Sequence, residues 1–138
     1  GCASTIGNWM LSGLLDTYED LKIGLIEAGV GWVPFVLEMY EHQFDEMLPN
    51  HASQLNKRPW EYWEKNFWTS FWFEKLGPRT QLDILGVDKV MFQTDFPHPT
   101  SLYPDVQSRL AETLGEKPYE VRKKVLQENA ATLWNLPF

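Results

Sequence analysis

Apolar residues recur along this chain either in short runs or at helical spacing, and the two patterns alternate. Short apolar runs predict strands within residues 21–26, 67–73 and 87–94, because buried parallel strands read as nearly continuous apolar segments. Apolar residues at helical spacing predict helices over 4–12, from Trp32 to about Pro49-Asn50, over 59–66 and 79–85, after Pro104 and from Pro118. Gly77-Pro78 are expected to precede the 79–85 helix, and Gly86 to end it as a left-handed cap.

The order of these elements is helix, strand, helix, strand, helix, strand, helix, and no tight hairpin turn joins two strands. Strands separated by helices require crossover connections, which belong to parallel sheets. The pattern therefore predicts an α/β fold.

Two carboxylates follow predicted strands in the same relative position. Asp95 comes just after the Val90-Met91-Phe92 run, and Glu27 follows the first strand and precedes a turn with two glycines. In parallel α/β folds the chemistry collects at the carboxyl ends of the strands, so both side chains are candidates for catalysis. The alternative is structural: either carboxylate can tie down its own turn by accepting hydrogen bonds from backbone N–H groups.

Composition and charge narrow the classes of function. The chain has 138 residues, 43% of them hydrophobic, which suffices for one cored domain. A net charge of −7 without a basic stripe argues against nucleic acid and anionic membranes as partners, and no apolar run has the length of a membrane span. No export signal begins the sequence, and Cys2 is its single cysteine, so we expect a reducing, cytoplasmic location without an internal disulfide.

Aromatic residues make up 14% of the chain, including seven Trp, and they concentrate between residues 59 and 73. An acidic, aromatic-rich chain suits a site for a small molecule or a sugar better than a site for a polyanion. Packing against helices or another subunit is the alternative for most of the cluster.

Three segments resemble the carboxyl-terminal half of the amidohydrolase-2 family, the metal-dependent hydrolases and decarboxylases related to aminocarboxymuconate-semialdehyde decarboxylase. The first segment is Asp20–Ile23 with Glu27–Pro34, the second is Leu85–Phe92 with Thr94–Pro99, and the third is Val125–Leu133. They occur in the family's order and with its spacings, over nearly the whole chain.

The resemblance implies a (β/α)₈ barrel, which normally takes about 250 residues. Residues 1–138 would form its carboxyl-terminal part, about three βα units with strands six to eight. By this correspondence Glu27 ends the sixth strand, Thr69-Ser70 lie near the end of the seventh, and Asp95 ends the eighth.

The resemblance also implies a divalent metal, with zinc expected, and a metal-activated water. Asp95 matches the family's ligand from the eighth strand and would bind the metal or deprotonate the water beside it. The family's other ligands are a His-x-His pair and a further His. His42, His51 and His98 are isolated and wrongly placed for these positions, so the remaining ligands are absent from this chain.

Glu27 stands where the decarboxylase branch has a catalytic His, although other family members carry Glu-x-Gly-x-Gly-Trp there. A carboxylate can act as an acid or base but cannot mimic an imidazolium, so hydrolysis of a small cyclic or aromatic substrate is the first expectation. Decarboxylation is the alternative. His98, between two prolines, is expected to support its loop or the substrate site, and Trp32 and Trp68 to line a substrate pocket.

Three strands cannot close a barrel, and a catalytic zinc site usually needs three protein ligands. We therefore expect the chain alone neither to bind metal tightly nor to turn over substrate, and to require the missing amino-terminal half or a homo-oligomer. Two alternatives remain: a non-catalytic half-barrel that folds by association, and an aromatic-rich binding module without hydrolytic activity.

Overall fold

The computed structural model describes residues 1–46 and 54–137, which form two compact units. Unit 1 comprises Gly1–Ile23 and Trp32–Phe67, and unit 2 comprises Gly24–Gly31 and Trp68–Phe138. The expected helix end at Pro49-Asn50 and the expectation for His51 lie outside the described residues.

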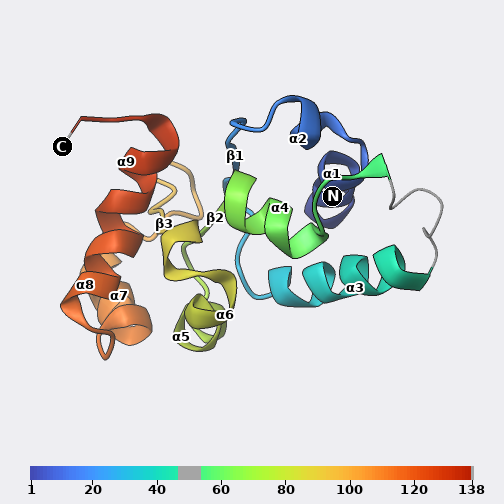
Figure 1. The fold of residues 1–138 in the computed structure, drawn as a ribbon. Helices are drawn as coiled ribbons and strands as arrows, with labels where there is room; N and C mark the ends of the chain where they lie inside the picture. The colour runs from blue at the N-terminus through green and yellow to red at the C-terminus, as the bar shows by residue number, and fades with distance from the viewer. Residues whose placement is uncertain (47–53, 138) are drawn as a thin grey trace. The chain divides into compact units, whose positions relative to one another are not determined.

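Unit 1 is helical (Figure 1). Its helices are α1 (Cys2–Leu11), α2 (Leu14–Thr17), α3 (Val33–Glu46) and α4 (Pro59–Asn66). The first, third and fourth pack on one another. Gly7 permits the close approach of α1 and α3, because a Cβ there would lie 2.2 Å from the Tyr40 hydroxyl oxygen, which donates a 3.0 Å hydrogen bond to the Ala3 carbonyl.

The aromatic segment supplies much of the core of unit 1. Tyr62, Trp63 and Phe67 are fully buried, and the rings of Trp63 and Phe67 stack with centroids 6.1 Å apart. The Tyr62 hydroxyl donates a 2.7 Å hydrogen bond to Asp16. For these residues the structure agrees with the packing interpretation of the cluster.

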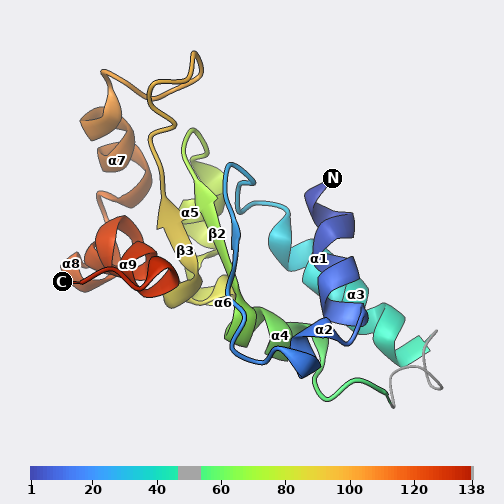
Figure 2. The same ribbon diagram turned by 90° about the horizontal axis from the view of Figure 1, so that it is seen from above.

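The sheet has three parallel strands, β1 (Ile23–Leu25), β2 (Phe67–Phe71) and β3 (Val90–Phe92), in the order β1-β2-β3 (Figure 2). Ser70 of β2 pairs with Met91 of β3. Helices separate the strands along the chain, as parallel pairing requires. The predicted α/β fold with a parallel sheet is therefore confirmed.

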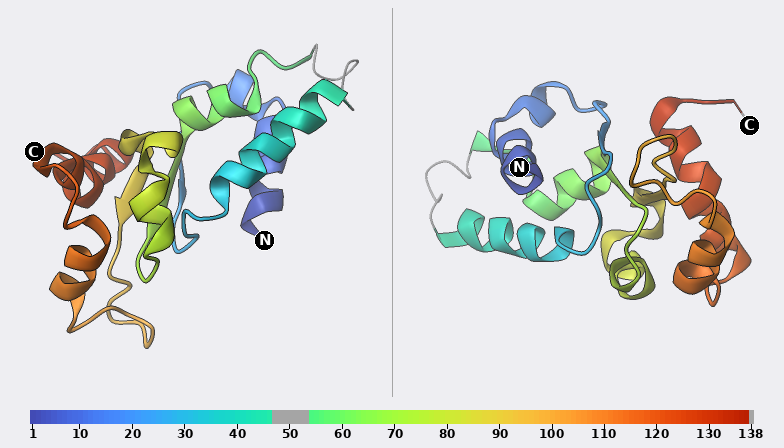
Figure 3. Two further views of the ribbon diagram at one scale, coloured as in Figure 1. Left: turned by 90° about the horizontal axis from the view of Figure 1, so that it is seen from below. Right: turned by 180° about the vertical axis from the view of Figure 1, so that it is seen from behind.

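The helices of unit 2 follow β2 and β3. They are α5 (Leu76–Thr80), α6 (Leu82–Leu85), α7 (Val106–Leu114), α8 (Tyr119–Lys123) and α9 (Asn129–Trp134), with a 3₁₀ turn at Val87–Lys89 and a π-helical segment at Lys124–Glu128. Figure 3 shows α7, α8 and α9 beside β3. Leu133 of α9 packs against Trp68 and Met91 of the sheet. Gly24 of β1 belongs to the same contact, because a Cβ there would lie 2.9 Å from a Leu133 methyl group.

The region between β2 and β3 differs from the prediction. The expected 79–85 helix begins earlier and breaks at Gln81, so Gly77 and Pro78 lie inside α5 instead of before it. Pro78 is tolerated because first-turn N–H groups have no partner within a helix. A Cβ at Gly77 would lie 2.6 Å from a Val30 methyl group, so glycine is needed for close packing. Gly86 has a φ of 88° but a ψ of 118°, so it ends the helix outside the left-handed helical conformation.

Candidate functional site

Glu27 and Asp95 both lie just beyond the carboxyl ends of strands in unit 2. Glu27 follows β1 and Asp95 follows β3, with β2 between these strands. Both residues adopt positive φ, 57° for Glu27 and 61° for Asp95. Residues with a side chain rarely adopt this conformation, and its cost, about 1–3 kcal/mol each, is borne where surrounding contacts enforce it.

A side chain of β2 and one from the residue that follows β3 fix the backbone of Glu27. Its N–H group points to the Ser70 hydroxyl at 3.2 Å and to the Gln93 side-chain oxygen at 3.1 Å. Ser70 in turn donates its hydroxyl hydrogen to the Gln93 oxygen at 2.5 Å. This network joins the ends of all three strands, and it accounts for the left-handed conformation of Glu27.

The Asp95 loop closes on itself through the carboxylate. One oxygen of Asp95 lies 2.9 Å from His98 Nδ1 and 2.9 Å from the Thr100 hydroxyl, which donates to it. The Asp95 carbonyl also accepts the His98 backbone N–H at 2.8 Å. The Asp95 side chain is only 6% exposed, whereas that of His98 is 59% exposed. His98 therefore supports the carboxylate from the solvent side, in agreement with the expectation that it stabilises its loop.

The carboxyl groups of Glu27 and Asp95 meet, and their pKa values move in opposite directions. A hydrogen bond to Asp95, the negative charge of Asp95 and burial raise the pKa of Glu27. Hydrogen bonds from Glu27, His98 and Thr100 lower the pKa of Asp95. Of two carboxyl groups this close, Glu27 therefore takes up a proton more readily than Asp95. Such a pair offers one proton donor and one proton acceptor.

Glu74 anchors the turn that carries Glu27. Its carboxylate accepts the Val30 N–H at 3.0 and 3.2 Å and the Gly31 N–H at 3.1 Å. Gly29, with a φ of 77°, brings the turn against this carboxylate, because a Cβ there would lie 2.9 Å from a Glu74 oxygen. The turn is thereby joined to the segment that follows β2.

Only part of this network follows from the sequence. Ser70 was expected near a strand end, whereas Gln93, Glu74 and Thr100 were not singled out. Gln93 precedes Asp95 by two residues after β3, so its position at the end of a strand could have indicated it. Nothing in the sequence links Glu74 to a turn more than forty residues earlier.

The two tryptophans expected to line a pocket have other surroundings. Trp68 is 5% exposed, is covered by Met91 and Leu133, and has the Lys89 ammonium 3.9 Å from its ring centroid. It lies in the amino-terminal half of β2, away from the strand ends that carry the carboxylates. The structure thus places Trp68 in the packing between sheet and helix. Trp32 is half-buried and belongs to unit 1.

The residues described do not make a metal site by themselves. Within residues 1–46 and 54–137, no three His, Cys, Asp or Glu side chains gather closely enough to hold an ion. Asp95 has the chemistry of a ligand, but a catalytic site usually needs three from the protein. The described residues therefore do not form a complete metal centre.

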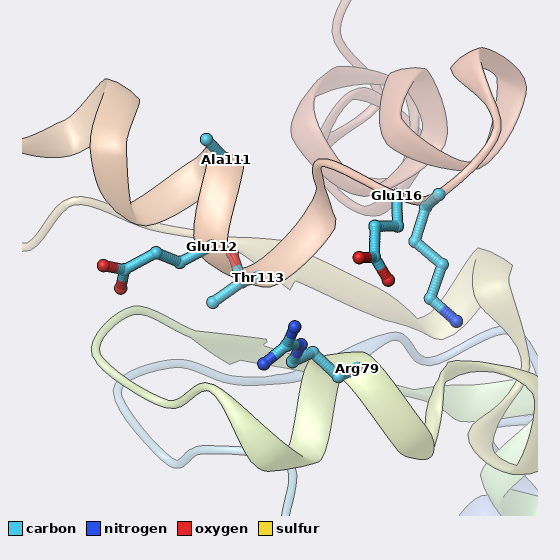
Figure 4. Close-up of a pocket in the computed structure, with 6 residues that line it drawn as sticks. Arg79, Ala111, Glu112, Thr113 and Glu116 are labelled. Carbon is cyan, nitrogen blue, oxygen red and sulfur yellow. The ribbon is translucent and has the colours of Figure 1, made fainter.

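A separate hollow of about 260 Å³ lies in the helical part of unit 2. Figure 4 shows Arg79 of α5 pointing toward Thr113 of α7, with Glu116 nearby. Side chains of both charges line it, and neither Glu27 nor Asp95 does.

Among the helices of the described residues, none is long and apolar enough to cross a membrane.

Solved structures resemble this chain over nearly its whole length. An amidohydrolase from Mycobacterium avium subsp. paratuberculosis K-10 matches 99% of it with a TM-score of 0.81 and 23% identity. The 5-carboxyvanillate decarboxylase of Sphingomonas paucimobilis matches 96% with a TM-score of 0.79 and 23% identity. A dihydroxybenzoic acid decarboxylase from Polaromonas sp. JS666, solved with manganese and the inhibitor 2-nitroresorcinol, matches 97% with a TM-score of 0.71 and 26% identity.

The chain spans only 33%, 39% and 40% of the lengths of these three proteins. Its three parallel strands and their helices correspond to part of a larger (β/α)₈ barrel. The sequence profile of the amidohydrolase family matches residues 3–136. Because this match covers almost all of the sequence, the chain belongs to the amidohydrolase family.

Proposed function

We propose that this chain supplies one part of the active site of a metal-dependent enzyme that acts on a small cyclic or aromatic substrate. The observation that supports the proposal is the meeting of the Glu27 and Asp95 carboxyl groups beyond the carboxyl ends of β1 and β3. Both residues hold positive φ there, and such strain concentrates at functional sites.

The two carboxyl groups have different roles in this proposal. Asp95, ionised, accepts a proton from a water or a substrate hydroxyl, and it is the ligand that this chain contributes to a divalent ion. Glu27, whose pKa the neighbouring Asp95 raises, donates a proton to the leaving atom of the substrate. The other ligands, the remaining strands and the identity of the ion belong to residues outside this chain, from the same polypeptide or from a partner subunit.

Hydrolysis is the reaction that a donor and an acceptor carboxyl group suit best. The second candidate is decarboxylation, which is favoured by the names of the similar structures, among them 2,6-dihydroxybenzoate decarboxylase from Rhizobium. Against it stands Glu27 itself, because a carboxyl group cannot provide the positive charge of an imidazolium beside a carboxylate substrate.

The test uses the polypeptide encoded by the whole reading frame that contains these residues. It is loaded with zinc or manganese and supplied with 2,6-dihydroxybenzoate, while release of carbon dioxide is recorded. In a separate assay it is supplied with a panel of aromatic amides and esters. We expect activity that Asp95→Asn abolishes and Glu27→Gln lowers by about two orders of magnitude, as for loss of a general acid.

The matched controls are Asp83→Asn and Glu38→Gln, which alter exposed carboxylates on α6 and α3 and should leave the rate unchanged. Release of carbon dioxide without hydrolysis of amides or esters would select the second candidate. Full activity in Asp95→Asn would reject both.

A further inference from the structure

The side chain of Gln93 has a fixed orientation. Its Oε1 faces the Glu27 backbone N–H at 3.1 Å and the Ser70 hydroxyl at 2.5 Å. A backbone N–H can only donate, so exchanging the oxygen and the NH₂ group would set two donors against each other. The carboxamide therefore directs its oxygen, and not its NH₂ group, at Glu27 and Ser70.

This orientation leaves the NH₂ group turned away from the network. Among the described residues, no hydrogen bond from Gln93 Nε2 to an acceptor is found, whereas its oxygen has two donors. The residue is half-buried and lies two positions before Asp95, and its oxygen reaches the backbone of Glu27. The NH₂ group thus has a fixed place on a side chain that contacts the backbone of Glu27.

We propose that the NH₂ group of Gln93 binds a carboxylate or carbonyl oxygen of the substrate and so orients it against Glu27 and Asp95. This rests on the proposed function, because it assigns a substrate contact within the same site. A neutral donor suits the position, because it attracts an oxygen that the Asp95 carboxylate would repel and it adds no charge to the site.

The proposed role of the Gln93 NH₂ group, which is to bind substrate, differs from the role of Ser70. Ser70 and the Gln93 oxygen together hold the Glu27 backbone, whereas only the Gln93 nitrogen has donors to spare. Removing the Ser70 hydroxyl weakens the network but leaves the NH₂ group present. Replacing Gln93 by Met removes the side-chain oxygen that holds the Glu27 backbone and also the NH₂ group, with similar volume and no change in charge.

The experiment is an NMR titration, without added metal, of the ¹⁵N-labelled polypeptide encoded by the whole reading frame that contains these residues. It is titrated with benzoate, and in parallel with toluene, which has the same ring and no acceptor oxygen. Benzoate is expected to shift the side-chain NH₂ resonances of Gln93 in a saturable way, and toluene is not. Gln93→Met should weaken benzoate binding by about tenfold or more, the range for a hydrogen bond to a charged group, while Ser70→Ala stays within about threefold of the unaltered chain.

Three results overturn the proposal. They are saturable benzoate binding that leaves the Gln93 NH₂ resonances unmoved, a loss in Ser70→Ala as large as in Gln93→Met, and no saturable shift of these resonances up to the solubility limit of benzoate. Resonances elsewhere in unit 2 that match those of the unaltered chain show that each variant is folded. Metal and turnover play no part in this titration, so it can fail while the activity test of the proposed function succeeds, and the reverse also holds.

Discussion

Glu74→Ala should loosen the turn that carries Glu27 without unfolding unit 2. The Glu74 carboxylate accepts N–H groups from Val30, which is fully buried, and from Gly31, which is exposed. Without it the Val30 N–H is left buried and unpaired, which costs about 2 kcal/mol, while water replaces the lost bond at Gly31 for less than about 1 kcal/mol.

Glu74→Gln should have a smaller effect, because both N–H groups already point to the same oxygen, Oε1, at 3.0 and 3.1 Å. A neutral amide oxygen can accept both, so only the charge-assisted part of the interaction, about 1 kcal/mol, is lost. The two substitutions therefore predict a graded response.

The assay is amide hydrogen exchange followed residue by residue. The Val30 amide should exchange roughly 30-fold faster in Glu74→Ala and roughly fivefold faster in Glu74→Gln, which are the factors that correspond to about 2 and 1 kcal/mol. Glu116→Ala, at an exposed carboxylate of the same unit, should change neither rate. Unchanged exchange at Val30 in Glu74→Ala, or equal acceleration in both variants, would refute the reasoning.

Three further outcomes are expected. Leu133→Ala should lower the free energy of unfolding by about 2–4 kcal/mol, because it opens a cavity against Trp68; a change below about 1 kcal/mol in urea unfolding would contradict the packing described. Burial and the hydrogen bond to Asp16 raise the pKa of Tyr62. The stabilisation of the fold by the neutral Tyr62 side chain is therefore fully present below the ordinary tyrosine pKa of about 10, and it is lost as pH rises through the higher pKa of the folded state. The advantage of the unaltered chain over Tyr62→Phe, about 1–2 kcal/mol at pH 8, should therefore shrink above pH 10, and a constant difference would argue against it. Calorimetric titration of the chain with zinc or manganese should show no tight binding, and tight one-to-one binding that disappears in Asp95→Ala would show that this chain needs no further ligands.

The local order of elements followed from the sequence because it depends on neighbours within one segment. Alternating apolar runs and helical spacing gave the parallel α/β arrangement, and turn residues after the runs marked Glu27 and Asp95 as strand-end carboxylates. The same local reasoning failed at Gly77-Pro78, where close packing against Val30 admits a helix that residue preferences alone argue against.

Only the tertiary structure decided what surrounds the two carboxylates. It set β2 between β1 and β3, so that Ser70 and Gln93 reach the backbone of Glu27 over 43 and 66 residues of sequence. It also gave Glu27 and Asp95 positive φ, which their residue types disfavour and which distant hydrogen bonds enforce. Periodicity shows which side of an element is buried, but the partner across the fold depends on strand order and register. That is why the sequence pointed to the carboxylates, while the hydrogen-bond network that holds them was visible only in the folded chain.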